Sequence, residues 1–409
     1  MYCQYCNICS SESVIIFKVL KVWVILECFA LSAAFTHTSN IMKASAAEVS
    51  DTLNPIQASN LTKFQPRPQS STTLDYQYLD YILENSVFYL GLSDRIRRVN
   101  RNTFNNGSRS LTVGHKSPYR LEGSRIYLKT LPPKFNEDMK AYREELQNLA
   151  ISLPITHLSR DEQLAFWLNI HNASIIELLS QQRRARSSKD KRFGAQKEAL
   201  HDVKIVQIGD TALSLRDIRE KIVYQNWSDP TVMYGFFLGD IGSPALKYSA
   251  FKGATVMARL EENAEEFVNA LRGFEIHKGR PQVSELYHRN AQMFFPQFNR
   301  DLKLHFKKYM RPEVYVLAQS VDSFTIAPYD YRVASITAGR NNDRTRIQVT
   351  QSYNPDLDQV FTSTEDIASD KNALGVLIRD YVKKRERLED MGLLENEVTI
   401  EDIETEDLP

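Results

Sequence analysis

The clearest pattern of hydrophobic and polar positions along the chain follows Ser159. Ser159 and Glu162 have the spacing of a capping box, in which two side chains bond the first backbone N–H groups of a helix. The apolar positions that follow recur at helical spacing and form one stripe: Leu164, Trp167, Leu168, Ile175 and Leu178. This pattern predicts an amphipathic helix over about residues 160–180, at the centre of the fold.

Further elements follow from the same kind of pattern. Helical spacing predicts helices around Leu79, Ile82 and Leu83, and at 213–223, 256–271 and 373–388. Short apolar runs predict strands at 203–208, 234–238, 314–317 and 324–326, and the Asn- and Gly-containing segment 99–125 predicts turns, with a hairpin as one alternative. Together they predict an α+β fold: a helix-rich single globular domain around a small sheet.

The composition excludes some classes of partner. Apolar residues make up 42% of the chain, as in water-soluble globular proteins, and 51 basic residues balance 51 acidic ones. No overall field therefore attracts nucleic acid, and we expect no nucleic-acid partner. The basic segment 183–197 contains no aromatic residue other than Phe193, so the sequence favours a solvated, mobile loop there.

The N-terminal segment resembles an export leader. Lys18 and Lys21 precede an apolar run at 22–35, and Ala44-Ser45-Ala46 provides a small-x-small cleavage pattern. We expect a signal peptide over 1–47 and an exported protein, periplasmic or secreted. Two alternatives stay open: the run remains as a membrane anchor, or translation starts at Met42 and the protein is cytoplasmic. The four cysteines all lie in this segment, at Cys3, Cys6, Cys9 and Cys28, so the cleaved chain would contain no thiol.

Composition also divides the rest of the chain. Residues 48–74 are rich in Ser, Thr, Pro, Gln and Asn and predict a linker, and residues 75–335 carry the patterns of a globular domain. Residues 336–409 predict a tail with one helix and a flexible acidic end, because the segment 389–407 contains nine acidic residues and no basic one.

Four segments resemble one known family. The helix run 158–173, LSRDEQLAFWLNIHNA, is similar to the signature helix of the domain-of-unknown-function 547 family. Three further segments match the family's order and spacing: 213–218 (LSLRDI), 239–246 (GDIGSPAL) and 328–331 (PYDY). The resemblance covers roughly residues 75–335 and implies a domain assignment, because no established activity of the family comes with it.

The departures from the family pattern concern polar positions. Where many members carry a cysteine before the proline of the glycine turn, this chain has Ser243. Arg219-Glu220 stand in place of Glu-His, Arg289-Asn290 in place of Trp-Tyr, and Met293 in place of Asp. The hydrophobic frame is kept, so the resemblance implies a retained fold with altered or lost chemistry.

Three residues form a catalytic hypothesis. Ser243 follows a predicted buried strand in a Gly-rich turn, where a nucleophile needs a base within hydrogen-bond reach and a group that orients the base. His171 and Asp240 are the candidates for these roles. The competing interpretation makes Ser243 a turn residue and His171 a hydrogen-bonded core histidine.

Asn169 and Asn172 are the candidates for ligand binding. They lie three residues apart on the predicted central helix and can share one face, either to bind a polar ligand or to clamp a neighbouring loop. No metal-ligand or nucleotide-binding spacing occurs in the sequence, so we expect no metal and no cofactor.

Two functions remain open on the sequence alone. The first is an exported binding or scaffolding domain with a drifted polar site, which engages an unknown protein or small-molecule partner and contacts a membrane only if the leader is retained. The alternative is a thiol-independent hydrolase or transferase that uses Ser243, His171 and Asp240. The sequence leaves open whether the protein is an enzyme.

Overall fold

The computed structural model describes residue 64 and residues 71–96, 119, 121–128, 131–183, 186–336 and 373–394, together with strands at 102–106, 109–113, 351–354 and 359–362. The predicted signal peptide, the four cysteines and most of the acidic end lie outside these residues. Of the predicted linker, Phe64 and residues 71–74 are described. Phe64 is buried, and its ring packs edge-on against Trp167 with the centroids 5.2 Å apart. Within the described residues, no helix is long and apolar enough to cross a lipid bilayer.

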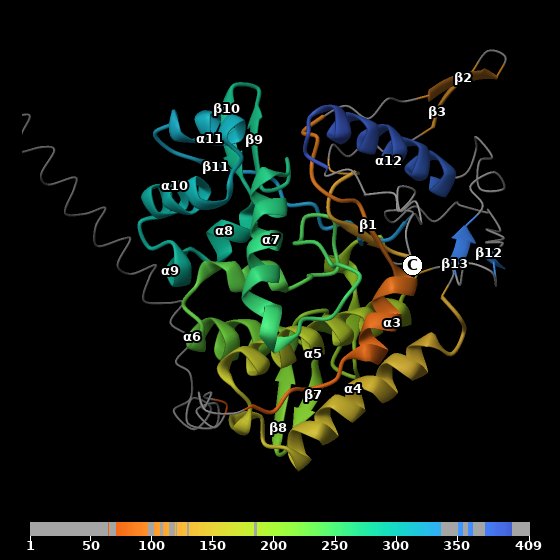
Figure 1. The fold of residues 1–409 in the computed structure, drawn as a ribbon, viewed down its shortest axis with the longest axis vertical. Helices are drawn as coiled ribbons and strands as arrows, with labels where there is room; N and C mark the ends of the chain where they lie inside the picture. The colour runs from red at the N-terminus through yellow and green to blue at the C-terminus, as the bar shows by residue number, and fades with distance from the viewer. Residues whose placement is uncertain are drawn as a thin grey trace, which may run out of the picture. The chain divides into compact units, whose positions relative to one another are not determined.

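The helix α5 (Arg160–Gln181) occupies the centre of the domain, as the sequence predicts (Figure 1). The hydroxyl of Ser159 caps it by accepting the N–H of Glu162 at 3.2 Å. The helices α4 (Phe135–Ser152) and α7 (Val256–Asn269) pack against α5. Every residue from Glu162 to Ser180 is buried, so α5 is covered on all sides and not along one stripe. Its polar side chains must therefore find partners inside the protein.

The remaining helices surround this core, and the fold is α+β. They are α3 (Gln77–Ser86), η2 (Ile155–His157), η3 (Ser188–Asp190), η4 (Asp217–Val223), α6 (Tyr224–Asn226), η5 (Pro230–Gly235), η6 (Gly253–Thr255), α8 (Glu285–Arg289), α9 (Ala291–Phe294), α10 (Phe298–Tyr309), α11 (Pro312–Gln319) and α12 (Ala373–Asp390). The helices predicted around Leu79, at 256–271 and at 373–388 are confirmed as α3, α7 and α12.

The described strands form several small sheets. The largest consists of β9 (Phe274–His277), β10 (Arg280–Val283) and β11 (Thr325–Ile326), in which β10 pairs antiparallel with β9 and parallel with β11. The others are two-stranded: β1 (Val87–Tyr89) with β4 (Ser124–Ile126), β2 (Asn102–Asn106) with β3 (Arg109–Val113), β5 (Arg192–Phe193) with β6 (Glu198–Ala199), β7 (Lys204–Ile208) with β8 (Thr211–Ser214), and β12 (Gln351–Asn354) with β13 (Gln359–Thr362). The strands predicted at 203–208 and 324–326 and the hairpin alternative within 99–125 are confirmed as β7, β11 and β2–β3.

Two predicted strands are wrong. Residues 234–235 end the 3-10 helix η5, and residues 236–238 continue as buried chain without a strand partner among the described residues. The side-chain amide of Asn172 bonds this segment at two backbone groups, Gly235 O at 2.9 Å and Phe237 N at 3.1 Å. These are backbone groups that a neighbouring strand would bond. Residues 314–317 belong to α11, which begins with Pro312 in the first helical position. A short apolar run fits a strand and a buried helix equally well.

The predicted helix at 213–223 is correct from residue 215 onward, and residues 213–214 belong to a strand. The strand β8 ends at Ser214, whose backbone N–H and hydroxyl both donate to Asp217 Oδ2 at 2.8 Å. This contact starts a π-helical segment, η4 (Asp217–Val223), which continues into α6. The wider π turn is frequent at functional sites, and here it carries Arg219.

The described residues of the basic segment 183–197 include regular structure, while four of its basic residues are exposed to solvent as the sequence favours: Arg186, Lys189, Arg192 and Lys197. The segment forms η3 and the hairpin β5–β6. Lys191 is fully buried and donates to Gln182 O at 2.9 Å. The hairpin is thereby attached to the end of α5.

The glycine turn is fixed to a distant segment. Gly239 has a φ of +86°, a conformation that favours glycine. A Cβ on Gly242 would lie 2.9 Å from the ring of Tyr329, so only glycine fits against it. The N–H groups of Ile241 and Gly242 donate to Arg332 O at 2.9 Å and Asp330 O at 3.0 Å. Two segments of the family resemblance, 239–246 and 328–331, thus lie side by side.

The helix α12 is held to the domain by a buried lysine. Leu377 of α12 joins Leu90, Leu121 and Ile336 in one hydrophobic cluster. Lys384 is 0% exposed, and its ammonium donates to the carbonyl oxygens of Leu90 and Leu121, each at 2.6 Å. Burial lowers its pKa to about 8.

This lysine makes stability depend on pH in the alkaline range. From about pH 8 to the ordinary lysine pKa of about 10.4, the unfolded chain holds one proton more than the native protein, so the free energy of unfolding rises with pH. In urea denaturation, we expect the free energy of unfolding of the wild type to rise by about 2 kcal/mol relative to that of Lys384→Met between pH 8 and pH 10. A constant difference would mean that the ammonium is not desolvated as described.

Candidate functional site

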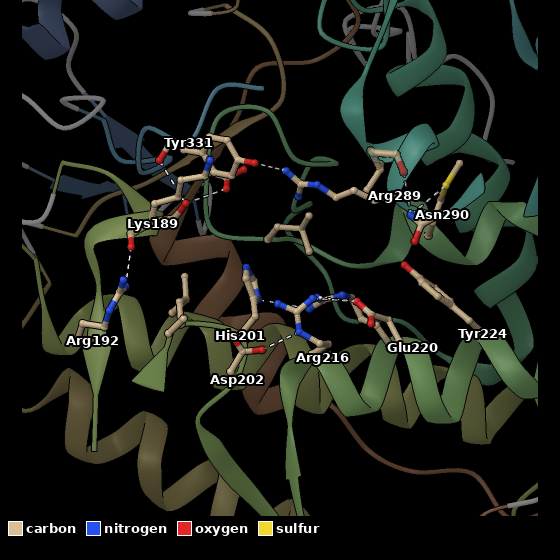
Figure 2. Close-up of a pocket in the computed structure, with 18 residues that line it drawn as sticks. Lys189, Arg192, His201, Asp202, Arg216, Glu220, Tyr224, Arg289, Asn290 and Tyr331 are labelled. Carbon is tan, nitrogen blue, oxygen red and sulfur yellow. Dashed lines mark hydrogen bonds and ion pairs between the residues drawn. The ribbon is translucent and has the colours of Figure 1, made fainter. Parts of the chain in front are cut away.

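A pocket of about 310 Å³ lies among η3, η4, α8 and the segment that contains Tyr331. Its lining includes apolar side chains, among them Leu200, Leu238 and Leu286. The charged and polar residues come from several elements, and Figure 2 shows Arg289 extending toward Tyr331, with His201 and Arg216 on the opposite side. The pocket therefore combines an apolar surface with cationic groups, as in sites that orient a small organic ligand.

Arg219 is the most buried of the pocket's cations, with 7% of its surface exposed. Its Nη1 lies 3.0 Å from His171 Nε2, 3.3 Å from His201 Nδ1 and 3.3 Å from Leu215 O. All three acceptors are neutral when the histidines are neutral. The nearest carboxylate is that of Glu220, 3.8 Å from Nη2 and half-exposed. A buried guanidinium without a hydrogen-bonded carboxylate leaves its positive charge available to a ligand.

The protonation of His171 follows from its neighbours. The amide of Asn172 is oriented by the backbone, because Nδ2 donates to Gly235 O and Oδ1 accepts from Phe237 N. Oδ1 therefore faces His171 Nδ1, 3.1 Å away, and this ring nitrogen must carry the hydrogen. Nε2 is left as the acceptor for Arg219. His171 is fully buried, and burial together with the charge of Arg219 holds its pKa well below the usual value.

His201 completes the support of Arg219 and lines the pocket itself. Burial and the nearby Arg219 also hold the pKa of His201 well below its usual value. Both imidazoles are thus neutral at physiological pH. They position the guanidinium without adding charge to the pocket.

Asp240 lies in the same pocket and is buried, with 3% of its surface exposed. Its Oδ1 accepts the hydroxyl of Tyr329 at 2.7 Å, and its Oδ2 lies 3.0 Å from the hydroxyl of Ser188. Burial raises the pKa of Asp240 to about 7, against the opposing effect of these two hydrogen bonds. The carboxyl can therefore carry or release a proton near neutral pH.

The positive charges in the wall exceed the negative ones. Arg216 is paired with Asp202 at 2.6 Å and with Glu220 at 3.4 Å, and Arg289 is paired with Glu285 at 2.9 Å. Three other lining cations contact no carboxylate within hydrogen-bond distance in the described part of the chain: Lys189, Arg192 and Arg219. Lys189 lies over the ring of Tyr331, 3.5 Å from its centre.

Within the described part of the chain, the side chains of the three residues in the catalytic hypothesis share no hydrogen bond with one another. The hydroxyl of Ser243 is buried and bonds Asp240 O at 2.7 Å and Pro244 O at 3.2 Å. His171 bonds Asn172 and Arg219, and the carboxyl of Asp240 bonds Tyr329 and Ser188. The three do not form a hydrogen-bonded series. Of them, only Asp240 lines the pocket.

Asn169 and Asn172 both fix backbone segments to α5. Asn169 donates to Phe251 O at 2.7 Å and accepts from Phe251 N at 2.9 Å. Asn172 holds the chain at Gly235 and Phe237, as described above. Their amide groups are engaged within the protein, as in the loop-clamp alternative. Among the described residues, no three His, Cys, Asp or Glu side chains gather where they could hold a metal ion.

Several pocket residues did not emerge from the sequence as site residues. Ser188, Lys189, Arg192 and His201 carry no motif, and the first three lie in the segment for which the sequence favours a solvated loop. The sequence contained one other indication of the pocket. Four positions at which the sequence departs from the pattern that it resembles line this one pocket: Arg219, Glu220, Arg289 and Asn290.

Comparison with known proteins gives one match. Residues 155–268 match the family model described as "Protein of unknown function, DUF547". The matched segment contains α5, the hairpin β7–β8, η4, the glycine turn and nearly all of α7. The resemblance inferred from the sequence is thereby confirmed over this segment. No curated protein and no solved structure matches the chain.

Proposed function

We propose that the domain is a binding module for a small organic anion, which enters the pocket and is bound by Arg219. The observation that carries this proposal is the environment of that guanidinium. It is buried, its described hydrogen-bond acceptors are two neutral imidazoles and one carbonyl, and no carboxylate of the described residues lies within hydrogen-bond distance. An anionic ligand would supply the missing charge through a charge-assisted hydrogen bond.

Other features of the pocket narrow the ligand's chemistry. Lys189 and Arg192, which have no carboxylate of the described residues within hydrogen-bond distance, add to the attraction for an anion. The apolar lining residues favour a ligand with an apolar body, and the volume of about 310 Å³ is at the small end of ligand pockets. The hydroxyl of Tyr224, which lines the pocket, makes no hydrogen bond within the described residues and is available to a polar group of the ligand. We therefore expect a compact organic acid.

The alternative, a hydrolase or transferase that uses Ser243, His171 and Asp240, has less support. The hydroxyl of Ser243 is 2.7 Å from Asp240 O and has no imidazole as a partner. A nucleophilic serine requires a base at hydrogen-bond distance. The export predicted from the leader is a separate proposal, which the intact mass of the mature protein and its cellular compartment would test.

A panel of matched ligands tests the binding proposal. Benzoate, benzenesulfonate and phenyl phosphate carry one apolar body with three anionic groups, and benzamide and benzyl alcohol are neutral counterparts. At a concentration about 100 times Kd, a ligand stabilises the native state by about 2.7 kcal/mol, so we expect the anions to raise Tm by on the order of 5 °C. Equal effects of the neutral compounds, or no effect of any anion, would contradict the proposal.

A further inference from the structure

The two contacts of the Ser188 hydroxyl are both hydrogen bonds only if the carboxyl of Asp240 carries a proton. The hydroxyl of Ser188 lies 3.0 Å from Asp240 Oδ2 and 3.2 Å from Tyr331 O. Both of these oxygens are acceptors if Asp240 is ionised, but a serine hydroxyl has only one hydrogen to donate. Both contacts are hydrogen bonds when Oδ2 itself carries a proton, donates it to Ser188 and lets the hydroxyl donate to Tyr331 O.

The groups around Asp240 favour this protonated form. From the segment 328–333, the hydroxyl of Tyr329 donates to Oδ1 at 2.7 Å, and the carboxylate of Asp330 raises the pKa of Asp240 further. From α8, Arg289 favours the ionised form, but its described hydrogen bonds go to Glu285 and Tyr331. From η3, the ammonium of Lys189 lies over the ring of Tyr331. The described contacts thus give the carboxyl of Asp240 no hydrogen-bonded cation.

We propose that the anion binds while Asp240 is protonated, so that ligand binding is coupled to the uptake of one proton at this carboxyl. The inference rests on the proposed function. Asp240 and Arg219 line one small pocket, and an ionised Asp240 would add a negative charge to the pocket that receives the anion. His171 and His201 stay neutral near neutral pH, and the pKa of Asp240 is about 7, so the change occurs in the physiological range.

Calorimetry with benzenesulfonate tests the coupling, because a sulfonate stays ionised at every pH used. If the ionised form of Asp240 does not bind, a pKa of about 7 makes the affinity of the wild type about tenfold weaker at pH 8 than at pH 6. Asp240→Asn mimics the protonated acid: its amide nitrogen can donate to Ser188, and its oxygen can accept from Tyr329. This variant should bind equally well at both pH values.

A matched control and a second measurement separate the possible outcomes. Glu262→Gln removes a carboxylate that does not line the pocket and should keep the tenfold change. A wild type with equal affinity at pH 6 and pH 8, or an Asp240→Asn variant that keeps the tenfold loss, would overturn the coupling and leave the anion pocket intact. If neither the wild type nor Asp240→Asn binds benzenesulfonate at pH 6, the proposed function and the coupling are overturned together.

The protonation of Asp240 can also be measured without a ligand. From pH 4 to pH 7, the native protein holds one proton that the unfolded chain has lost, so the free energy of unfolding of the wild type should fall relative to Asp240→Asn as the pH rises. Above pH 7 the difference should level off. A difference that stays constant from pH 4 to pH 7 would show that Asp240 is ionised in the native protein, and would overturn the inference.

Discussion

Replacement of Arg219 by methionine is expected to weaken benzenesulfonate binding at pH 6 by about a hundredfold. The guanidinium provides the most buried positive charge in the pocket, and the loss of a desolvated charge-assisted contact typically costs 2–5 kcal/mol or more in binding. Isothermal titration calorimetry measures the effect directly. Methionine retains an apolar body of similar length and removes a buried charge, so the variant should remain folded.

Arg300→Met is the matched control for this experiment. Arg300 does not line the pocket, and its described side-chain hydrogen bond is made to the exposed Gln297 at 2.8 Å. The control removes the same charge, so it corrects for any effect of net charge on anion binding. Equal affinities of the two variants would show that Arg219 does not contact the ligand.

Replacement of His171 by phenylalanine should impair stability and binding together. Phenylalanine fits beside Phe236, whose ring lies 4.8 Å from the imidazole, but it removes the acceptor at Nε2 and the donor at Nδ1. Loss of a hydrogen bond to a buried charged group should lower the free energy of unfolding by about 2 kcal/mol. The less restrained guanidinium of Arg219 should bind benzenesulfonate about tenfold more weakly, because a ligand must then order it. Urea denaturation and calorimetry on one sample measure both effects.

His171→Gln distinguishes a positioning role from a purely structural one. A glutamine side chain can again offer an acceptor to Arg219, so it should recover part of the lost affinity even if it packs less well. A phenylalanine variant with the stability and affinity of the wild type would mean that the imidazole does not hold Arg219.

The central helix illustrates how far the sequence predicts this fold. The cap at Ser159 and the apolar spacing correctly indicate the start and length of α5. They do not show that its polar side is also buried. Asn169 and Asn172 are satisfied by backbone groups 63 to 82 residues later in the chain, and no local pattern records contacts of that range.

The errors in the strands have a related cause. At 234–238 and 314–317, four or five apolar residues indicate burial but do not determine backbone conformation. In the first case the clamp from Asn172 replaces a strand neighbour, and in the second case Pro312 begins a helix. Tertiary contacts and one helix-start signal therefore decide what periodicity leaves open.

Part of the site could be predicted from the sequence. Asp240 was a candidate residue, and Arg219 and Arg289 stood out as charged replacements in a recognised pattern. Their meeting in one pocket depends on the paths of η4 and α8, which spacing alone does not predict. Lys189 and Arg192 resembled ordinary surface charges, because basic runs without aromatic residues are usually solvated. Their place in the pocket follows from the buried anchor Lys191 between them.

A crystal structure of the protein with 4-bromobenzenesulfonate at pH 6 tests the central claim most directly. The anomalous signal of bromine locates the apolar end of the ligand independently of the sulfonate. We expect bromine near the apolar side chains of Leu200, Leu238 and Leu286, and a sulfonate oxygen at about 3 Å from the guanidinium of Arg219. A ligand bound outside the pocket, or inside it with the sulfonate away from Arg219, would contradict the assignment of this pocket as an anion-binding site.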